Sequence, residues 1–290
     1  MPELPEVEGV VRSLKPVVEG KTIQSVQISL TVKASHEAGK QSIVKGTTPE
    51  QLIEHLEGMK IVQITRRSKY ILFDLERDGQ QYKMINHLGM SGGWFDLKNS
   101  EEIQEGKFQN HRHLELQLDG DQTLVYADIR RFGEVRLVEN LTQFPPILKL
   151  APEPFDADAK QYFLDCCNLP KYKNKEIKAV IMDGQVLCGC GNIYATEALF
   201  RAGIKPGRKT SLISGTKKEQ LFDTIIAVLL ESIAFGGSSI SDYRNINGEA
   251  GGMQDRLKMY GMNICPMCHT NTKQKTIAGR NSYYCPNCQK

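Results

Sequence analysis

The most constraining feature of the 290-residue chain is a group of four cysteines near its C-terminal end. Cys265-Pro-Met-Cys268 and Cys285-Pro-Asn-Cys288 are two C-x-x-C pairs separated by sixteen residues. Four thiolates in two such pairs form a closed tetrahedral zinc site, and closed four-sulfur sites are structural rather than catalytic. Free cysteines that share this spacing by coincidence are the alternative. We predict one structural Zn²⁺ ion bound by a short β-hairpin over residues 263–290.

The other cysteines form two pairs, Cys166-Cys167 and Cys188-Gly-Cys190, in a region of helical periodicity. Their spacing suits metal ligation poorly and their neighbours are apolar, so we predict that they pack in a core. The chain has no apolar run of membrane-spanning length and no signal-type segment, which predicts a cytoplasmic protein with reduced thiols. Metal binding, rather than disulfide bonding, is therefore the expected use of the C-terminal cysteines.

The first six residues, Met1-Pro2-Glu3-Leu-Pro5-Glu6, place a proline directly after the initiator methionine. If Met1 is removed, Pro2 has a free secondary amine with a pKa of about 7.7–8.0, so a useful fraction is neutral near pH 7. Such an amine is a nucleophile, and the iminium that it forms is permanently cationic and withdraws electrons. Glu3 and Glu6 are candidate proton donors and acceptors beside it. The same residues also suit an ordinary helix start, with Pro5 and Glu6 in the first turn.

Cationic residues are concentrated in three parts of the chain, although the net charge is only +3. Residues 58–73 and residues 265–290 contain lysines and arginines but no acid, and residues 171–178 contain four lysines and a single glutamate. Three separate basic clusters favour a polyanionic partner such as nucleic acid. For any one cluster, solvated lysine side chains are the alternative interpretation.

Short alternating apolar runs dominate the first half of the chain, after a helix predicted over residues 6–18. Turn signals at Arg77-Asp78-Gly79 and Asp119-Gly120-Asp121 separate these runs. We expect an antiparallel two-layer β-sandwich, with a polar loop from residue 31 followed by a short helix over residues 49–56. The expected strands are residues 23–28, 60–66, 70–75, 82–87, 113–118, 123–127 and 135–138.

The proline-rich stretch from Phe144 to Pro154 cannot continue a helix or a strand, so it marks a linker between domains. Helical periodicity then covers residues 159–166, 176–182, 193–202 and 217–235. The predicted class is a multidomain α+β protein. Its expected parts are an N-terminal antiparallel β-sandwich with flanking helices over residues 1–141, a hinge linker over 142–156, a helical domain over 157–262 and the zinc hairpin over 263–290.

A glycine-rich motif, Gly189-Cys-Gly191-Asn192-Ile-Tyr-Ala-Thr-Glu197, precedes one of the predicted helices. Glycines allow a ligand to approach the backbone closely, and the free N–H groups of a helix N-terminus bind anions. The motif follows a helix and not a strand, so it is no dinucleotide-binding loop. A phosphate of a nucleic-acid backbone is the expected ligand, and a simple N-cap within a helix–turn–helix is the alternative.

Five motifs, in this order, resemble the bacterial formamidopyrimidine-DNA glycosylase family (Fpg/MutM). They are the N-terminal Met-Pro-Glu-Leu-Pro-Glu, His87-Leu-Gly-Met90-Ser-Gly, Asp128-Ile-Arg130-Arg-Phe132-Gly, Gly191-Asn192-Ile-Tyr-Ala and the four-cysteine module. The resemblance extends from residue 2 to residue 290. The related Nei branch usually has glycine where Leu4 stands and lacks this set of Met, Arg and Phe, so the sequence resembles the Fpg branch.

The resemblance implies a DNA repair enzyme that excises oxidised purines, such as 8-oxoguanine and formamidopyrimidines, and then nicks the abasic site by β/δ-elimination. Pro2 would attack the anomeric carbon of the damaged nucleotide, Glu3 would act as general acid or base, and Glu6 would support the Pro2 terminus. Lys69 matches the family lysine that holds a phosphate beside the lesion. Arg280 matches a family phosphate clamp, and both join the expected catalytic set.

A second set of residues is implied to bind damaged double-stranded DNA. A base must leave the stack before its sugar can be attacked, and the gap must then be filled. Met90 suits an apolar wedge, Arg130 can replace lost base hydrogen bonds, and Phe132 can stack on or kink the partner strand. The helical domain is implied to be a helix–two-turns–helix domain with a lid loop over residues 237–253. The expected DNA-binding residues are His87, Met90, Arg130, Phe132, Asn192, Tyr260 and Arg280.

Two departures from the family pattern concern lesion choice, because Met253 replaces a usual aromatic residue and Met262 replaces a usual arginine. Three hypotheses follow. The first is a bifunctional glycosylase and lyase for oxidised purines, and the second is the same fold and chemistry directed at oxidised pyrimidines, other lesions or abasic sites. The third is a non-catalytic binder of damaged DNA, which the intact Pro2, Glu3 and Lys69 disfavour. We expect a monomer in the bacterial cytoplasm, associated with the nucleoid, and no membrane partner.

Overall fold

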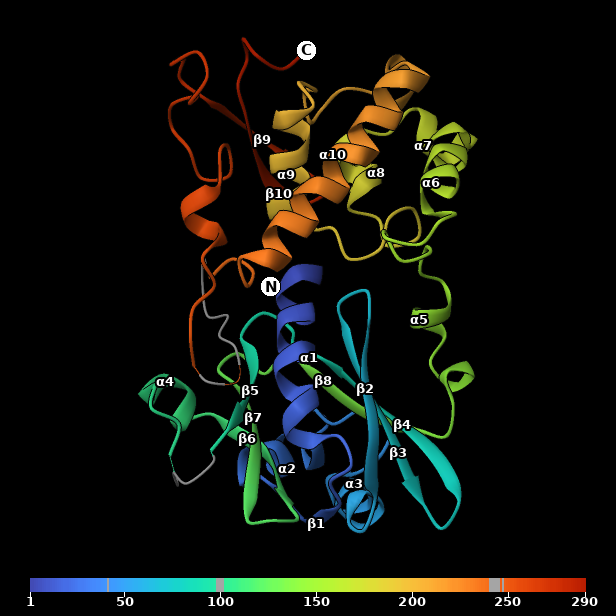
Figure 1. The fold of residues 1–290 in the computed structure, drawn as a ribbon, viewed down its shortest axis with the longest axis vertical. Coiled ribbons are helices and arrows are strands. Elements are labelled where there is room, and N and C mark those ends of the chain that lie inside the picture. The colour runs from blue at the N-terminus through green and yellow to red at the C-terminus, as the bar shows by residue number, and fades with distance from the viewer. Residues whose placement is uncertain (41, 98–101, 240–245, 247) are drawn as a thin grey trace. The chain divides into compact units, whose positions relative to one another are not determined.

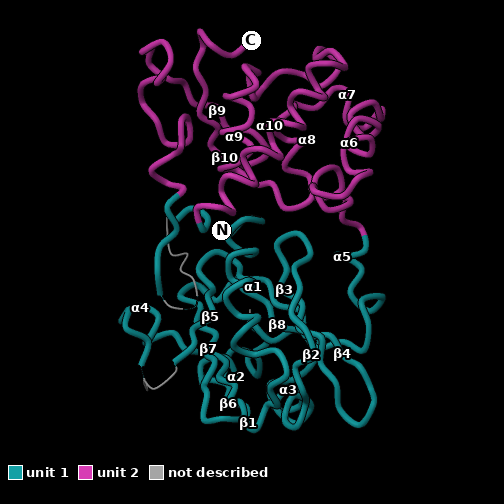
Figure 2. Tube along the Cα trace, viewed as in Figure 1, with its two compact units in different colours: residues 1–148, 236–252 teal, residues 149–235, 253–290 magenta. Residues whose placement is uncertain are grey.

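The computed structural model describes residues 1–40, 42–97, 102–239, 246 and 248–290. It contains two compact units (Figure 2): unit 1 comprises residues 1–148 and 236–252, and unit 2 comprises residues 149–235 and 253–290. The boundary after Leu148 falls within the predicted linker. The expected lid loop contributes most of the second piece of unit 1, and its residues 240–245 and 247 lie outside the described residues.

Unit 1 is built on two four-stranded antiparallel sheets, with strand orders β1-β6-β7-β5 and β2-β3-β4-β8 (Figure 1). Consecutive strands are joined by tight turns where the sequence predicts them, because Asp78, Gly79, Gly120 and Asp121 all have positive φ. The strands are β1 Ile23–Ile28, β2 Lys60–Arg67, β3 Tyr70–Arg77, β4 Gln80–His87, β5 Gly92–Asp96, β6 Arg112–Leu118, β7 Gln122–Asp128 and β8 Glu134–Val138.

The core of unit 1 is formed by alternate side chains of both sheets and by the apolar face of the first helix. Trp94 is fully buried there, and its indole N–H donates a hydrogen bond to Asn86 Oδ1 at 2.9 Å. The Trp94 ring also packs against Phe73 and Tyr126, with centroids 5.4 and 5.2 Å away. The helices of unit 1 are α1 Leu4–Val18, α2 Leu30–Glu37, α3 Pro49–Leu56, α4 Gly106–Gln109 and α5 Pro145–Leu148.

Three local features of unit 1 differ from the sequence-based expectations. The segment expected to be a polar loop contains α2, which Ser29 caps by accepting a hydrogen bond from Val32 N. Only Val32 of that helix is buried, so it leaves no apolar periodicity to detect. Strand β5 was not expected, because it begins with two glycines, and α5 begins at Pro145, where a proline suits the first helical turn.

Unit 2 packs helices around a second core and ends in the expected hairpin. Its longest helix, α10, contacts α6 and α9, and α9 also contacts strand β10. Cys166, Cys167, Cys188 and Cys190 are all buried, as predicted from their apolar neighbours. The elements are α6 Ala159–Asn168, α7 Pro170–Lys173, α8 Ile177–Ile181, α9 Asn192–Arg201, α10 Gly215–Ala234, β9 Lys273–Ile277 and β10 Arg280–Tyr284.

The architecture confirms the predicted α+β class, with an N-terminal antiparallel β-sandwich, a helical second unit and a C-terminal four-cysteine hairpin. Among the residues that the structure describes, no helix combines the length and apolar character required to cross a bilayer.

Candidate active site and nucleic-acid-binding residues

The N-terminal motif forms the start of α1 and buries its two acids. Glu3 is the N-cap, and Glu3 and Glu6 are only 3% and 2% exposed. The Glu3 N–H donates to Glu6 Oε2 at 2.8 Å as part of a capping box. The helix-start interpretation is therefore correct, and Pro2 directly precedes the buried N-cap residue Glu3.

The segment after α10 contacts the same carboxyl group. Ser238 N–H donates to Glu6 Oε1 at 2.7 Å, across more than two hundred positions of sequence. A Cβ on Gly237 would lie 2.9 Å from Glu6 Oε1, so only glycine allows this approach. Glu6 thus binds one donor from its own helix and one from residues 236–252. Sequence reasoning missed Ser238, because nothing local to that residue marks the contact.

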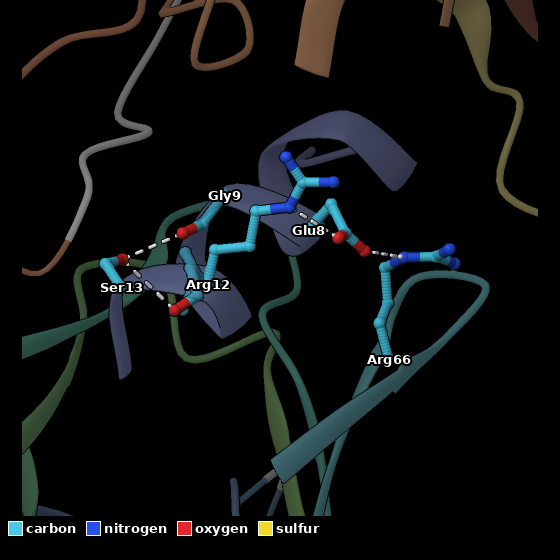
Figure 3. A network of polar contacts seen from close by, with 6 residues as sticks. Glu8, Gly9, Arg12, Ser13 and Arg66 are labelled. Carbon is cyan, nitrogen blue, oxygen red and sulfur yellow. Dashed lines mark hydrogen bonds and ion pairs between the residues drawn. The ribbon is translucent and has the colours of Figure 1, made fainter. Parts of the chain in front are cut away.

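Lys69 lies in the tight turn between β2 and β3. An ion pair between Arg66 of β2 and the half-buried Glu8 connects this turn to α1 (Figure 3). Arg66 Nε donates to Glu8 Oε2 at 2.8 Å, and Arg66 Nη1 donates to the Ser68 carbonyl at 3.1 Å. Ser68 has a φ of +56° and is buried, so the turn is held in a conformation that few side chains favour. Glu8 and Arg66 therefore couple the turn that presents Lys69 to the helix that presents Pro2.

Glu8 also binds Arg12, whose Nε donates to the other carboxylate oxygen at 2.7 Å. Burial raises the pKa of Glu8, but the hydrogen bonds and charges of Arg66 and Arg12 outweigh it and leave the pKa below its ordinary value. The Arg66 side chain is 8% exposed and that of Arg12 is 63% exposed. Arg66 is therefore the partner that matters structurally.

His87 lies at the end of β4, near Lys69, and is held neutral. Burial, together with the positive charges of Lys69 and the chain's amino terminus, lowers the pKa of His87 to about 4. The Gly89 N–H donates to His87 Nδ1 at 3.1 Å. Because a neutral imidazole has one donor and one acceptor, Nε2 must carry the proton. His87 therefore offers an uncharged N–H donor.

Met90, Arg130 and Phe132 come from two loops that a single buried carboxylate connects. Asp128 is fully buried; its Oδ1 accepts from Ser91 Oγ at 2.7 Å and its Oδ2 accepts from Gly133 N–H at 2.7 Å. The Arg130 N–H donates to Ser91 Oγ at 2.9 Å. The Met90 loop and the Arg130–Phe132 loop are thus hydrogen-bonded into one structure.

Glycine allows the same two loops to touch. A Cβ on Gly89 would lie 2.5 Å from Gly133 N and 2.5 Å from the Phe132 carbonyl carbon, which the backbone cannot accommodate. On this base the Phe132 side chain is 46% exposed, and the Arg130 guanidinium lies 5.1 Å from its ring centroid. The structure therefore presents a cation and an aromatic ring to solvent on a rigid support.

In unit 2, Asn192 is the first residue of α9 and follows the N-cap Gly191. Its side-chain Oδ1 is buried without a hydrogen-bond partner among the described residues. Glu197, further along α9, is fully buried and accepts hydrogen bonds from the backbone N–H groups of residues 258, 259 and 260 at 2.8 Å each. This carboxylate fixes Tyr260 beside Tyr283 of β10, with ring centroids 5.8 Å apart, and β10 begins at the exposed Arg280.

The four C-terminal cysteines converge as their spacing predicts. All four Sγ atoms lie within 4.8 Å of one another, with 3.4 Å between Cys268 and Cys285 and 3.9 Å between Cys265 and Cys288. Thiolates around a tetrahedral ion at a bond length of about 2.3 Å would lie about 3.8 Å apart. The cluster therefore has the donors and the geometry to hold one metal ion.

Comparison with known proteins agrees with this arrangement. The N-terminal domain of formamidopyrimidine-DNA glycosylases matches residues 1–135, and the H2TH domain of the same enzymes matches residues 150–244. A formamidopyrimidine-DNA glycosylase of an Exiguobacterium species is 36% identical over 293 residues, covering 100% of this chain and 99% of the relative. One from Geobacillus kaustophilus is 33% identical and covers 100% of both chains. The chain belongs to the formamidopyrimidine-DNA glycosylase family.

Solved structures of the family share the fold at full length. Fpg of Lactococcus lactis, in complex with DNA that contains an abasic site, has a TM-score of 0.83 and is 33% identical, and the match covers 99% of each chain. MutM (Fpg) of Thermus thermophilus has a TM-score of 0.80 and is 32% identical, covering 99% of this chain and 98% of that one. The resemblance inferred from the motifs is thus confirmed, as is the expectation of an enzyme of DNA repair.

The two departures from the Fpg pattern have different surroundings. Met253 is fully buried and packs in the core of unit 2. Met262 is half-buried, and its carbonyl accepts the Thr272 hydroxyl hydrogen bond. Residues 240–245 and 247 of the expected lid loop lie outside the described residues. Met253 therefore contributes to packing within unit 2.

Proposed function

We propose that the chain is a DNA repair glycosylase with AP lyase activity that excises oxidised purines. The observation that carries this proposal is the N-terminal motif, in which Pro2 precedes the buried N-cap Glu3, whose N–H donates to the buried Glu6 carboxylate. A relative with this fold binds DNA that contains a formamidopyrimidine lesion, as the Lactococcus lactis Fpg complexes do. Damaged double-stranded DNA is accordingly the proposed partner.

In the proposed reaction, removal of Met1 frees the Pro2 amine, which attacks the anomeric carbon of the damaged nucleotide. The glycosidic bond breaks and the base leaves with its electron pair and a proton, for which Glu3 is the proposed general acid. Opening of the sugar ring gives a cationic iminium on Pro2. This electron sink acidifies the neighbouring sugar protons, so two successive eliminations release the 3′ and then the 5′ phosphate.

Glu6 is the proposed support of the Pro2 terminus, because Glu3 N–H and Ser238 N–H both donate to its carboxylate and fix its position. Lys69 is the proposed contact for the phosphate beside the lesion. His87 can add a neutral hydrogen bond, since its Nε2 carries a proton at physiological pH. Both side chains belong to the structure that Arg66 and Gly89 hold in place.

For DNA binding we propose Met90, Arg130 and Phe132 as the side chains that fill the gap left by the extruded base. Unstacking costs a few kcal/mol per base step. Charge-assisted contacts with phosphates by Lys69 and Arg280 would offset that cost. Asn192, at the start of α9, and Tyr260 are proposed as further DNA contacts.

We propose zinc as the ion of the cysteine cluster, because four sulfur donors at these distances suit tetrahedral Zn²⁺. Cys265, Cys268, Cys285 and Cys288 would hold it, and its role would be to fold the hairpin that bears Arg280. With DNA as substrate, we further propose a monomer in the bacterial cytoplasm, associated with the nucleoid.

A second candidate function is the same chemistry directed at oxidised pyrimidines or at abasic sites. It is supported by Lactococcus lactis Fpg, which has been solved in complex with DNA that contains an oxidised pyrimidine and with abasic-site DNA. Single-turnover excision rates on a panel of lesion duplexes would separate the two. A preference for a pyrimidine lesion over 8-oxoguanine would overturn the purine assignment.

The decisive experiment is borohydride trapping on a duplex that carries 8-oxoguanine opposite cytosine, after the intact mass has established whether Met1 is absent. Reduction should convert the iminium into a covalent protein–DNA adduct, and peptide mapping should place it on Pro2. If no adduct forms although Met1 is absent, an abasic-site duplex is used next. Trapping there would indicate changed specificity, and failure there would indicate a binding protein without catalysis.

A further inference from the structure

A second basic site lies in unit 2, on residues that the proposed reaction does not use. It is a hollow of about 340 Å³ lined by Lys205, Pro206, Gly207, Arg208, Lys275, Tyr284 and Lys290. Tyr284 and Arg280 are the opposite ends of β10. Four residues of strand correspond to about 13 Å, so the hollow is distinct from the phosphate contact proposed for Arg280.

Backbone hydrogen bonds fix two walls of the hollow. Lys205 N–H donates to the Lys290 carbonyl at 2.9 Å, and Lys290 N–H donates to the Gly203 carbonyl at 3.0 Å. Arg208 N–H donates to the Lys205 carbonyl at 3.0 Å and closes a turn between them. The backbone positions of three of the four cationic residues are thus fixed.

An ion pair fixes the third wall. Lys275 Nζ lies 2.5 Å from Glu176 Oε1, and the Arg208 carbonyl accepts from Ile177 N–H at 2.8 Å. A Cβ on Gly207 would lie 3.1 Å from both Glu176 Oε1 and Lys275 Nζ, which is tighter than side chains normally accept. Glycine at this position therefore leaves room for the Glu176–Lys275 ion pair.

Cationic side chains outnumber acidic side chains around the hollow. Lys205, Arg208, Lys275 and Lys290 line it, and Glu176 is the acid that pairs with Lys275. Like charges concentrated around a concave surface raise the local positive potential and favour a bound anion. An anion is therefore the ligand class that would relieve the mutual repulsion of the remaining cations.

The aromatic side chain of Tyr284 indicates which class of anion the hollow binds. Successive strand residues face opposite sides, so Tyr283 packs against Tyr260 while Tyr284 lines the hollow beside Pro206. Cations combined with an aromatic ring are the usual means of binding an unpaired nucleotide, whose phosphate is neutralised while its base stacks. The volume falls at the lower end of the roughly 300–1,000 Å³ typical of small-molecule sites, and it exceeds what a bare ion needs.

We propose that this hollow binds a nucleotide, with the phosphate among the four cations and the base against Tyr284. The nucleotide would be either free or an unpaired residue of a strand, since both sources present the same groups. This site is additional to the lesion site, and its occupation does not depend on the glycosylase reaction.

The test is a titration of the ¹⁵N-labelled full chain, in which the amide signals of Gly207, Arg208 and Tyr284 are followed. The ligands are thymidine 5′-monophosphate, inorganic phosphate, thymidine and a thymidine pentanucleotide. We expect the monophosphate to shift these three amides saturably, at a Kd at least tenfold below those of phosphate and thymidine. A pentanucleotide that binds more tightly than the monophosphate would identify a strand as the source, and the reverse order would identify a free nucleotide.

Two matched pairs of substitutions test whether binding depends on the residues that line the hollow. Lys205→Glu combined with Lys290→Glu should raise the Kd about 100-fold, roughly tenfold for each charge-assisted hydrogen bond removed. Lys149→Glu combined with Lys209→Glu changes the net charge equally on exposed side chains that do not line the hollow, and it should have little effect. Excision from a lesion duplex should be unaffected by the control pair.

Three results would overturn the proposal. Equal affinity for inorganic phosphate would show an ion site without base recognition. An equal loss in both variant pairs would show non-specific attraction, and the absence of shifts at the three amides would show no site. None of these results bears on the borohydride test of Pro2, so the two proposals fail independently.

Discussion

At the scale of single residues, the site depends on the buried Glu6 and the half-buried Glu8, each of which has one partner far away in the sequence. Glu6 binds the N–H groups of Glu3 and Ser238, and Glu8 binds Arg66 and Arg12. A buried carboxylate that loses a donor has no solvent to replace it, so each of these contacts is both stabilising and position-defining. The N-terminal end of α1 is therefore fixed from several directions.

Arg66→Gln should lower the free energy of unfolding by about 1–3 kcal/mol, because it leaves the half-buried Glu8 with one exposed partner. Cleavage of an abasic-site duplex should slow by about tenfold or more, since Lys69 loses its support. Denaturant melts and single-turnover cleavage would measure the two effects.

Arg12→Gln is the matched control, because it removes the exposed partner of the same carboxylate and should change stability by less than about 1 kcal/mol. The pKa of Glu8 is lowered in the folded chain, so the pair stabilises the fold above the ordinary pKa of a glutamate, and this contribution is lost as the pH falls through the lowered value. Equal effects of both substitutions would contradict the assignment.

His87 should remain neutral throughout the physiological pH range. With a folded pKa of about 4, against about 6.5 for an unperturbed histidine, it resists protonation in the fold while the unfolded chain accepts a proton. The resulting stability is present above about pH 6.5 and is lost as the pH falls towards 4. NMR titration of the imidazole signals would check the value.

His87→Gln should therefore make the free energy of unfolding less dependent on pH between 4 and 6.5. Because His87 stays neutral between pH 7 and 8, its titration should not change the DNA affinity over that range. His55→Gln changes an exposed histidine and provides the comparison. A His87 that titrates near 6.5 would refute the neutral-donor role.

At the scale of elements, the β4–β5 and β7–β8 loops are held together because Asp128 accepts hydrogen bonds from both. Ser91 Oγ and Gly133 N–H donate to its two oxygens, and Gly89 packs directly against the Phe132–Gly133 backbone. Met90, Arg130 and Phe132 therefore share a support formed by the β4–β5 and β7–β8 connections. A side chain that separates stacked bases requires a rigid support, because on a flexible support the side chain would be displaced and the bases would stay stacked.

Asp128→Asn should weaken this support, since an amide has one acceptor oxygen and leaves a buried donor unpaired, at about 1–3 kcal/mol. We expect excision from an intact lesion duplex to slow more than cleavage at an abasic site, where no base must be extruded. Asp121→Asn, on an exposed turn, is the control. Equal slowing on both substrates would indicate a general loss of structure.

At the scale of the whole molecule, the proposed function requires the DNA contacts of unit 1 and unit 2 to act on one duplex. Lys69, His87 and the wedge residues belong to unit 1, and Asn192, Tyr260 and Arg280 belong to unit 2. Phosphate contacts release counterions, so the affinity should fall steeply with salt concentration.

Removal of the metal should lower this salt dependence. Without the proposed zinc ion the hairpin should unfold and the proposed Arg280 contact should be lost, so the slope of log affinity against log salt should decrease by about one. Metal content and binding isotherms at several salt concentrations would measure both. A metal-free chain that binds DNA as tightly as before would contradict the role of Arg280.

Much of the fold follows from local sequence. The strands of the sandwich other than β5, the helices α1 and α9 and the cysteine hairpin were predicted to within a few residues, because each has its own periodicity, turn residues or ligand spacing. Helix α2 and strand β5 were missed, since a helix with one buried residue and a strand that opens with two glycines carry no such pattern.

The sequence by itself therefore determined the chemistry available to this protein. It placed a proline second in the chain, acids beside it and four thiols at metal-binding spacing. Only the tertiary structure decided which distant groups hold these residues. Glu6 binds Ser238, Asp128 supports Met90 and Phe132 together, and Gly207 admits an ion pair, since such contacts arise from chain segments that meet only after folding.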